Sequence, residues 1–216
     1  ATLPFSSVGP RLGDVLPLDA DSLLDRLVQG RRGGYCFEQN GLLFEVLLEL
    51  GFDARIQLAR VIHNQDIHPG LTHRVTLVEI DGRSYVADVG FGGDGLVWPV
   101  PLEGGREVFA EPRDAPGAVG HRIVREGGEV RALQTFANGA WKDLYAFTLE
   151  PQLAVDYEMA NHFTSTYPRS HFVLSLTAQR ARRHRRAILR NRELVVRTAG
   201  GISSSTVRDP DHLLEV

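Results

Sequence analysis

Apolar residues at helical spacing define two segments near the start of the chain. The first follows Asp19, a residue type that suits the N-cap position, and ends at Gly30. The second extends from Phe37 to Leu50 and ends at Gly51, because glycine readily adopts the left-handed conformation that follows many helices. The positions that set this period are Leu23, Leu24, Leu27, Val28, Phe37, Leu43, Phe44, Leu47, Leu48 and Leu50. The pattern predicts two amphipathic helices.

After Gly51 the period of the pattern changes to two. Apolar and polar residues alternate from Ala54 to Leu58, and again over residues 72–80 and 83–90 on either side of Asp81-Gly82. Further strands are predicted at residues 122–125, 130–136, 141–149, 172–177 and 194–198, and a further helix at residues 153–160. Helices come first and hairpin-connected strands follow, which predicts an α+β fold with an antiparallel sheet or barrel.

The Asp81-Gly82 dipeptide is the strongest short hairpin signal in the chain, and it fixes a register. If these two residues form the loop, Val75 pairs with Asp88, and His73 shares their face of the sheet. His73 and Asp88 are then diagonal neighbours within reach of a carboxylate–imidazole hydrogen bond. That bond would fix the tautomer of the ring and leave its other nitrogen free to act as a base.

Cys36 is the only cysteine of the chain, and it lies at the predicted start of the second helix. Unpaired backbone N–H groups and the helix dipole favour an anion there, and the thiolate is the nucleophilic form of cysteine. A lone cysteine is more often an inert buried residue, so position alone leaves both interpretations open. With Cys36 in reach of His73, the three residues would form a thiolate–imidazolium pair oriented by Asp88. Only the fold decides whether they meet.

A metal site is the competing interpretation of the histidines. His63, His68 and His73 recur at five-residue intervals, but that spacing matches neither one face of a helix nor alternate strand positions. A second cysteine ligand is also absent from the sequence. We therefore expect no metal.

Composition narrows the class of protein. A chain of 216 residues with 43% hydrophobic residues can bury a core. The net charge of −3 gives no reason to expect a nucleic-acid partner, and the basic run over residues 180–186 is predicted to be a solvated surface. No apolar run approaches membrane-spanning length, and one cysteine suits a reducing compartment, so we expect a cytoplasmic protein without a membrane partner.

Several blocks of the sequence resemble the arylamine N-acetyltransferase family. These blocks are Arg32-Gly33-Gly34-Tyr35-Cys36-Phe37-Glu38-Gln39-Asn40, Thr72-His73-Arg74-Val75, Asp88-Val89-Gly90-Phe91-Gly92-Gly93, Asn161-His162-Phe163-Thr164-Ser165-Thr166-Tyr167-Pro168 and Leu194-Val195-Val196-Arg197. They stand in the family's order and extend through most of the chain, which makes the resemblance specific.

The resemblance implies a fold with a cysteine-protease-like core in three parts. These are an N-terminal helical bundle over residues 1–52, an antiparallel β-barrel over residues 53–155 and an α/β lid over residues 156–216. Members of the family usually carry a few dozen helical residues before the segment that begins here at Ala1, and they continue beyond Val216. We therefore expect the helical bundle and the lid to be truncated.

The same resemblance assigns roles to individual residues. Cys36 is expected to be the acylated nucleophile, His73 the base and Asp88 the orienting carboxylate. Residues expected to contact the substrate are Phe91, Gly92 and Phe37. Acetyl-CoA or a related thioester is the expected donor and a co-substrate, with no permanently bound cofactor, and an arylamine, hydrazine or arylhydroxylamine is the expected acceptor. Two half-reactions through one cysteine predict ping-pong kinetics.

Two alternatives remain open at this point. Amide synthases that close ansamycin-type macrolactams resemble the same family, take the acyl group from a carrier protein and share the triad. The basic segment 182–186 would suit such an acidic carrier protein as a partner. The second alternative is a non-catalytic protein that binds acyl-CoA or an aromatic ligand, against which the presence of all three triad residues argues.

Overall fold

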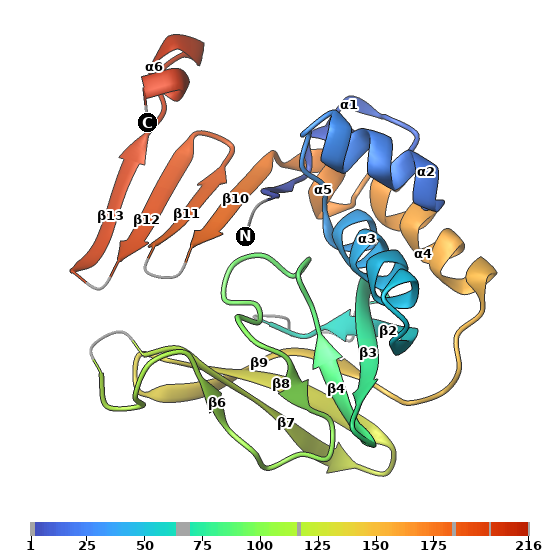
Figure 1. Cartoon of the computed structure of the whole chain (residues 1–216). Helices are drawn as coiled ribbons and strands as arrows, with labels where there is room; N and C mark the ends of the chain where they lie inside the picture. Colours follow the sequence, from blue (N-terminus) through green and yellow to red (C-terminus); the bar gives the residue numbers. More distant parts are fainter. Residues whose placement is uncertain (1–2, 64–69, 116–117, 183–184, 199, 216) are drawn as a thin grey trace.

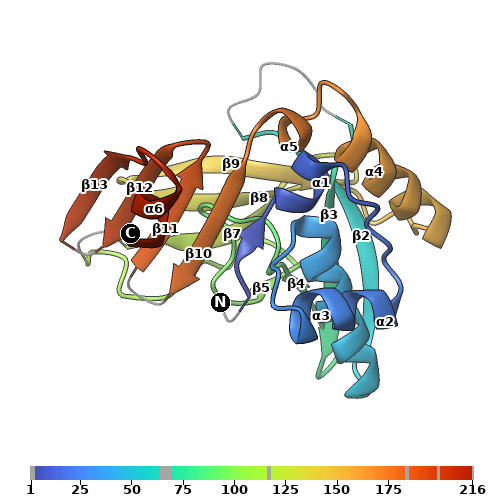
Figure 2. The same cartoon turned by 90° about the horizontal axis from the view of Figure 1, so that it is seen from above.

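The structure is a computed structural model that describes residues 3–63, 70–115, 118–182, 185–198 and 200–215. A group of helices covers one side of a strongly curved eight-stranded sheet, and a second sheet of five strands stands beside both (Figures 1 and 2). Within the described residues, no helix is both long enough and apolar enough to cross a membrane.

The helical group combines segments from both halves of the chain. Its members are α1 (Val8–Leu12), α2 (Ala20–Leu23), the π-helix η1 (Leu24–Gln29), α3 (Cys36–Glu49), α4 (Ala154–Thr166) and α5 (His171–Leu174). Both helices predicted near the start of the chain are confirmed, including their ends. The Oδ1 atom of Asp19 accepts the N–H of Ser22 at 2.9 Å, and Gly51 adopts a φ of 82° after α3. The N–H groups of Gly51 and Phe52 then bond the carbonyls of Leu48 and Leu47, which closes the helix in a Schellman motif.

The returning helices α4 and α5 pack against the first ones, as Figure 1 shows. The predicted helix at residues 153–160 is confirmed and continues to Thr166. The predicted strand at residues 172–177 is wrong except at its last residue, Thr177. Ser170 acts as an N-cap whose hydroxyl oxygen accepts the N–H of Phe172, so the apolar residues that follow form α5 and the strand begins only at Thr177.

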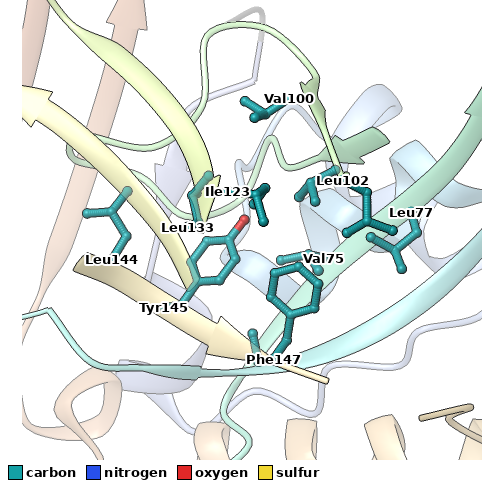
Figure 3. Packing of buried hydrophobic residues seen from close by; sticks show 11 residues of the cluster. Val75, Leu77, Val100, Leu102, Ile123, Leu133, Leu144, Tyr145 and Phe147 are labelled. Carbon is teal, nitrogen blue, oxygen red and sulfur yellow. The ribbon is translucent and has the colours of Figure 1, made fainter. Parts of the chain in front are cut away.

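The larger sheet is antiparallel throughout and nearly closes into a barrel, as predicted. Its strands, in spatial order, are β5 (Val100–Pro101), β4 (Arg83–Ala87), β3 (His73–Ile80), β2 (Asp53–Val61), β9 (Ala140–Phe147), β8 (Val130–Ala137), β7 (Gly120–Gly127) and β6 (Val108–Phe109). Side chains from the inner faces of these strands fill its centre (Figure 3). The buried members of this core are Ala59, Val75, Leu77, Val86, Val100, Leu102, Ile123, Leu133, Leu144, Tyr145 and Phe147.

The hairpin of β3 and β4 has the predicted register. Asp81 and Gly82 both have positive φ angles, 51° and 71°, which is the conformation of a two-residue type I′ turn. Leu77 pairs with Val86, and the ladder ends one step before Asp88. Since successive side chains of a strand alternate, His73 faces the barrel interior, whereas Arg74 faces the helices and lies over the rings of Phe44 and Tyr157.

The smaller sheet joins the two ends of the chain. Its strands, in spatial order, are β1 (Phe5–Ser6), β10 (Thr177–Arg182), β11 (Arg185–Arg190), β12 (Glu193–Thr198) and β13 (Gly201–Thr206), and α6 (Pro210–Glu215) follows. Phe5 pairs with Gln179, which places the start of the chain against the last third of the sequence (Figure 2). The division into segments 1–52, 53–155 and 156–216 remains a prediction.

Candidate active site

Helix α3 begins at the lone cysteine, and its first six residues are buried. Cys36 is the first residue of the helix, is 3% exposed and lies at the end where backbone N–H groups lack partners within the helix. The side chain of Glu38 accepts the N–H of Tyr35 at 3.2 Å, and Gly33 enters the turn with a φ of 70°. A side chain on Gly34 would meet Leu27 and Glu38 at 2.8–2.9 Å, so only glycine allows this close approach.

The end of the β3–β4 hairpin brings His73 and Asp88 together. The Nε2 atom of His73 lies 2.8 Å from Oδ2 of Asp88, and the two residues are 2% and 4% exposed. Burial alone disfavours the charged imidazolium, but the carboxylate of Asp88 and the sulfur of Cys36 outweigh it and raise the pKa of His73 to about 10. Burial likewise opposes the charge of Asp88, whereas His73 and the hydrogen bonds from Asn40 and Gly90 lower the pKa of that carboxyl. The pair is therefore charged at neutral pH.

Cys36 meets this pair from the helix side. Its sulfur lies 3.8 Å from the carbonyl oxygen of Thr72, the residue before His73, and its charge and hydrogen bond contribute to the raised pKa of His73. The structure thus brings Cys36, His73 and Asp88 into one cluster, with Nε2 of the ring on the carboxylate. The other ring nitrogen, Nδ1, is left as the atom that can exchange a proton with a reacting group.

A cavity of about 500 Å³ opens beside this cluster. We call the side formed by Cys36, Thr72, His73, Gly90 and Phe91 the inner wall. The side formed by strands β10–β12 is called the outer wall, and its residues are Thr177, Gln179, Ile188, Arg190 and Arg197. Phe5, Leu144 and Phe172 add apolar surface between them. The cavity therefore offers an apolar space that ends at a thiol, an imidazole and, on the far side, two guanidinium groups.

The three residues expected to contact the substrate lie in different surroundings. Phe91 lines the cavity, and its ring stands edge-on to that of His73 with centroids 5.2 Å apart. Gly92 lines a small neighbouring cavity and has a φ of 73°. Phe37 is fully buried against Tyr35 and is not among the residues that line either cavity.

Two residues that the sequence interpretation overlooked surround the His73–Asp88 pair. Asn40, one helical turn after Cys36, donates from Nδ2 to Oδ1 of Asp88 at 2.8 Å. The ring of Tyr145 lies 4.9 Å from that of His73, and burial together with the charge of Asp88 raises the pKa of its hydroxyl well above the ordinary value. The spacing of Asn40 from Cys36 was a usable signal, because residues four apart share a helix face. Tyr145 comes from a distant strand and gave no local signal.

The loop that carries Phe91 is fastened to the outer wall. Gln179 accepts the N–H of Gly93, and Arg197 pairs with Asp94 at 2.8 Å. Arg186 donates to the carbonyl of Gly95 at 3.1 Å. The prediction that the basic run is a solvated surface is therefore wrong for Arg186. Arg183 and His184 of that run lie outside the described residues. Arg186 therefore stabilises the loop that carries Phe91.

The histidines do not assemble a metal site within the described part of the chain. No group of three or more His, Cys, Asp or Glu side chains there could hold a metal ion. Nδ1 of His63 lies 3.1 Å from the carbonyl oxygen of Asp143, and His68 lies outside the described residues.

A cysteine at a helix start, beside an imidazole that a carboxylate orients, is the arrangement of enzymes that form a covalent intermediate on sulfur. Comparisons with known proteins identify the family. The model of the N-acetyltransferase family matches residues 1–216. The chain belongs to the arylamine N-acetyltransferase family.

Individual relatives agree with this assignment. The arylamine N-acetyltransferase of Mycolicibacterium smegmatis is 40% identical over 206 residues, which are 92% of this chain and 72% of the relative. That of Escherichia coli (strain K12) is 40% identical over 172 residues, which are 79% of this chain and 59% of the relative. The structure of the Mycobacterium marinum arylamine N-acetyltransferase in complex with CoA is similar with a TM-score of 0.88 and 33% identity, covering 99% of this chain and 78% of that chain.

Proposed function

We propose that this protein transfers an acetyl group from acetyl-CoA to the nitrogen of an arylamine or hydrazine, or to the oxygen of an arylhydroxylamine. The observation that carries the proposal is the family match over residues 1–216 in a chain whose Cys36, His73 and Asp88 cluster beside one cavity. The CoA complex of the Mycobacterium marinum relative supports the donor. A relative named arylamine N-acetyltransferase / N-hydroxyarylamine O-acetyltransferase supports both kinds of acceptor.

The reaction proceeds in two half-reactions through Cys36. The thiolate attacks the carbonyl carbon of acetyl-CoA, the carbon–sulfur bond to CoA breaks, and the departing CoA thiolate takes a proton from the imidazolium of His73. The amine then attacks the acetylated Cys36 while neutral His73 accepts a proton from its nitrogen. The bond to Cys36 breaks, and the thiolate–imidazolium pair is restored. Asp88 stabilises the charged ring and holds its tautomer in both steps.

The two alternatives have less support. Nothing in the comparisons favours an amide synthase or a carrier-protein partner. The binder alternative leaves unexplained why a buried carboxylate, imidazole and thiol would be kept together, since burying charged groups is costly. We further propose a cytoplasmic location, because a single cysteine suits a reducing compartment.

Intact mass measurement tests the proposal directly. Incubation with acetyl-CoA and no acceptor should add one acetyl group on Cys36, and a later addition of an arylamine should remove it. The Cys36→Ala variant serves as the control and should gain no mass. Wild-type protein that stays unacetylated with acetyl-CoA, but gains an acyl group from a carrier-bound thioester, would favour the amide synthase instead.

A further inference from the structure

The cavity beside Cys36 combines an apolar interior with an excess of positive charge. Its aromatic lining consists of Phe5, Phe91 and Phe172, which suits a ring. Among the residues that line it, the only acid is Asp94, and that carboxylate already pairs with Arg197. The outer wall's second arginine, Arg190, therefore has no carboxylate among the lining residues to balance its positive charge.

The surroundings of Arg190 do not neutralise it. Within the described part of the chain Arg190 forms no ion pair, and its cross-strand neighbour Glu193 accepts a hydrogen bond from Thr206 instead. Partial burial, together with the charge of Arg190, lowers the pKa of His171, another lining residue, so that ring stays neutral near neutral pH. A planar guanidinium on the wall of an apolar cavity favours a carboxylate, which it can bind through two parallel hydrogen bonds.

We propose that Arg190 binds the carboxylate of an acidic arylamine, so that aminobenzoate-type acceptors are preferred over neutral arylamines of the same shape. The inference rests on the proposed function and names its acceptor class. The cavity volume of about 500 Å³ is in the range of pockets that hold a small aromatic molecule. The amine nitrogen and the carboxylate of 4-aminobenzoate are about 6 to 7 Å apart, so both ends fit.

The phosphates of the donor fit this position less well. The pantetheine arm of CoA separates its sulfur from the nearest phosphate by about 15 Å when extended, which is about twice the distance between the two ends of 4-aminobenzoate. With the thioester at Cys36, an extended arm therefore carries the phosphates well beyond the position of an aminobenzoate carboxylate. This favours the acceptor over the donor as the source of the anion.

Ping-pong kinetics allow the two sources to be separated, because kcat/KM for the acceptor and for the donor report different half-reactions. The acceptors are 4-aminobenzoate and the matched neutral 4-aminobenzamide, and the variants are Arg190→Gln and the control Arg192→Gln in the neighbouring turn. We expect Arg190→Gln to lower kcat/KM about 10-fold for aminobenzoate only, with the value for acetyl-CoA unchanged. Arg192→Gln should change neither acceptor.

Each other outcome has a defined meaning. An equal loss with both acceptors, or no loss with either, contradicts the inference. A loss of kcat/KM for acetyl-CoA alone, absent with a short acetyl thioester that lacks phosphates, would mean that Arg190 binds the donor. That result also contradicts the inference. Failure of wild-type protein to acetylate Cys36, or to acetylate either of the two arylamines, contradicts the proposed function itself.

A different observation concerns Asn40, which lies at the centre of the inner wall's hydrogen bonds. Asn40 is fully buried on the same helix face as Cys36. Its Nδ2 atom donates to Oδ1 of Asp88 at 2.8 Å and to the carbonyl of Arg74, and its Oδ1 atom accepts the N–H of Val89 at 3.0 Å. One amide thus connects the nucleophile's helix to β3 and to the segment that directly follows β4.

We infer that Asn40 is a positioning residue that holds Asp88 so that its Oδ2 atom faces His73. Without it, Oδ1 keeps only the N–H of Gly90, and the carboxylate can turn. Asn40→Ala should lower kcat about 10- to 100-fold with little change in KM, since small displacements of reacting groups cost that much. It should also shift the pH profile of Cys36 alkylation by iodoacetamide, because the orientation of the ring changes.

The matched control is Gln39→Ala. Gln39 is also buried on α3, but its amide donates to the carbonyls of Pro4 and Gly34 instead of to Asp88. The Gln39→Ala variant should lower the stability of the fold and leave the pH profile of Cys36 alkylation unchanged. An unshifted profile in Asn40→Ala, or the same shift in Gln39→Ala, would assign Asn40 a purely structural role.

Discussion

The two walls of the cavity are built in different ways. On the inner wall, His73 is nearly inaccessible to solvent, as is its partner Asp88, and each carboxylate oxygen of Asp88 has a hydrogen-bond partner. The outer wall belongs to a sheet whose arginines are partly or fully exposed, and whose last strand, β13, is exposed along its whole length. Buried, fully hydrogen-bonded groups hold one geometry, whereas exposed side chains keep several. We therefore assign bond chemistry to the inner wall and substrate selection to the outer one.

The largest test of this comparison replaces two carboxylates, Asp88, which is the partner of His73 on the inner wall, and Asp94, which is the partner of Arg197 on the outer wall. Asp88→Asn keeps the shape of the side chain but removes the charge that stabilises the imidazolium of His73, and kcat/KM should fall about 10⁴-fold. Asp94→Asn removes the partner of Arg197 in the same cavity and should cost less than about 10-fold. Steady-state kinetics with acetyl-CoA and an arylamine give both values, and circular dichroism checks that the variants are folded. Similar losses in the two variants would remove the distinction between the walls.

The inner wall was also the part of the site that local sequence patterns could predict. The Asp81-Gly82 turn fixes the hairpin register, and this register, continued one residue past the end of β4, predicts that Asp88 lies near His73, where the structure has it. Contacts between residues far apart in the sequence could not be predicted in this way. The pairing of Phe5 with Gln179 spans most of the chain, and the burial of Arg186 depends on a loop from the other sheet. Neither contact leaves a periodic trace in the sequence.

A second test uses the contact between the inner wall's helix and hairpin. A Cβ atom on Gly90 would lie 2.8 Å from both Nδ2 of Asn40 and the Cα of Cys36, so Gly90→Ala must displace the loop from the helix. We expect kcat/KM about 100-fold lower, because a displacement of about 1 Å is sufficient for such a loss. Gly70→Ala is the control, since its Cβ would meet only Thr72 at an ordinary 3.6 Å. Full activity in Gly90→Ala would mean that the inner wall tolerates movement.

A third test compares the pH dependence of stability. The pKa of His73 rises from 6.5 to about 10 on folding, so its contribution is complete below about pH 6.5 and is lost as the pH rises to about 10. The pKa of Asp88 falls from 3.8, so its contribution is complete above about pH 4 and is lost in stronger acid. The gap in urea midpoint between wild type and Asp88→Asn should therefore be largest from about pH 4 to 6.5 and shrink toward pH 10. The corresponding gap for Asp94→Asn should stay constant from pH 6 to 10, and a constant gap for both variants would mean that His73 is not charged.

The smallest expected effect lies where the two walls meet. Gln179 of β10 accepts the N–H of Gly93, and a Cβ atom on Gly92 would lie 3.0 Å from its amide, so this side chain sets the position of the loop that carries Phe91. Gln179→Ala removes one hydrogen bond at a partly exposed site and should raise the acceptor KM about 3- to 10-fold, with kcat within about 2-fold of wild type. Gln179→Glu keeps an oxygen acceptor and should restore most of the affinity. The ratio of the two effects decides the comparison: if kcat falls more than KM rises, the outer wall positions the reacting groups as well as the substrate.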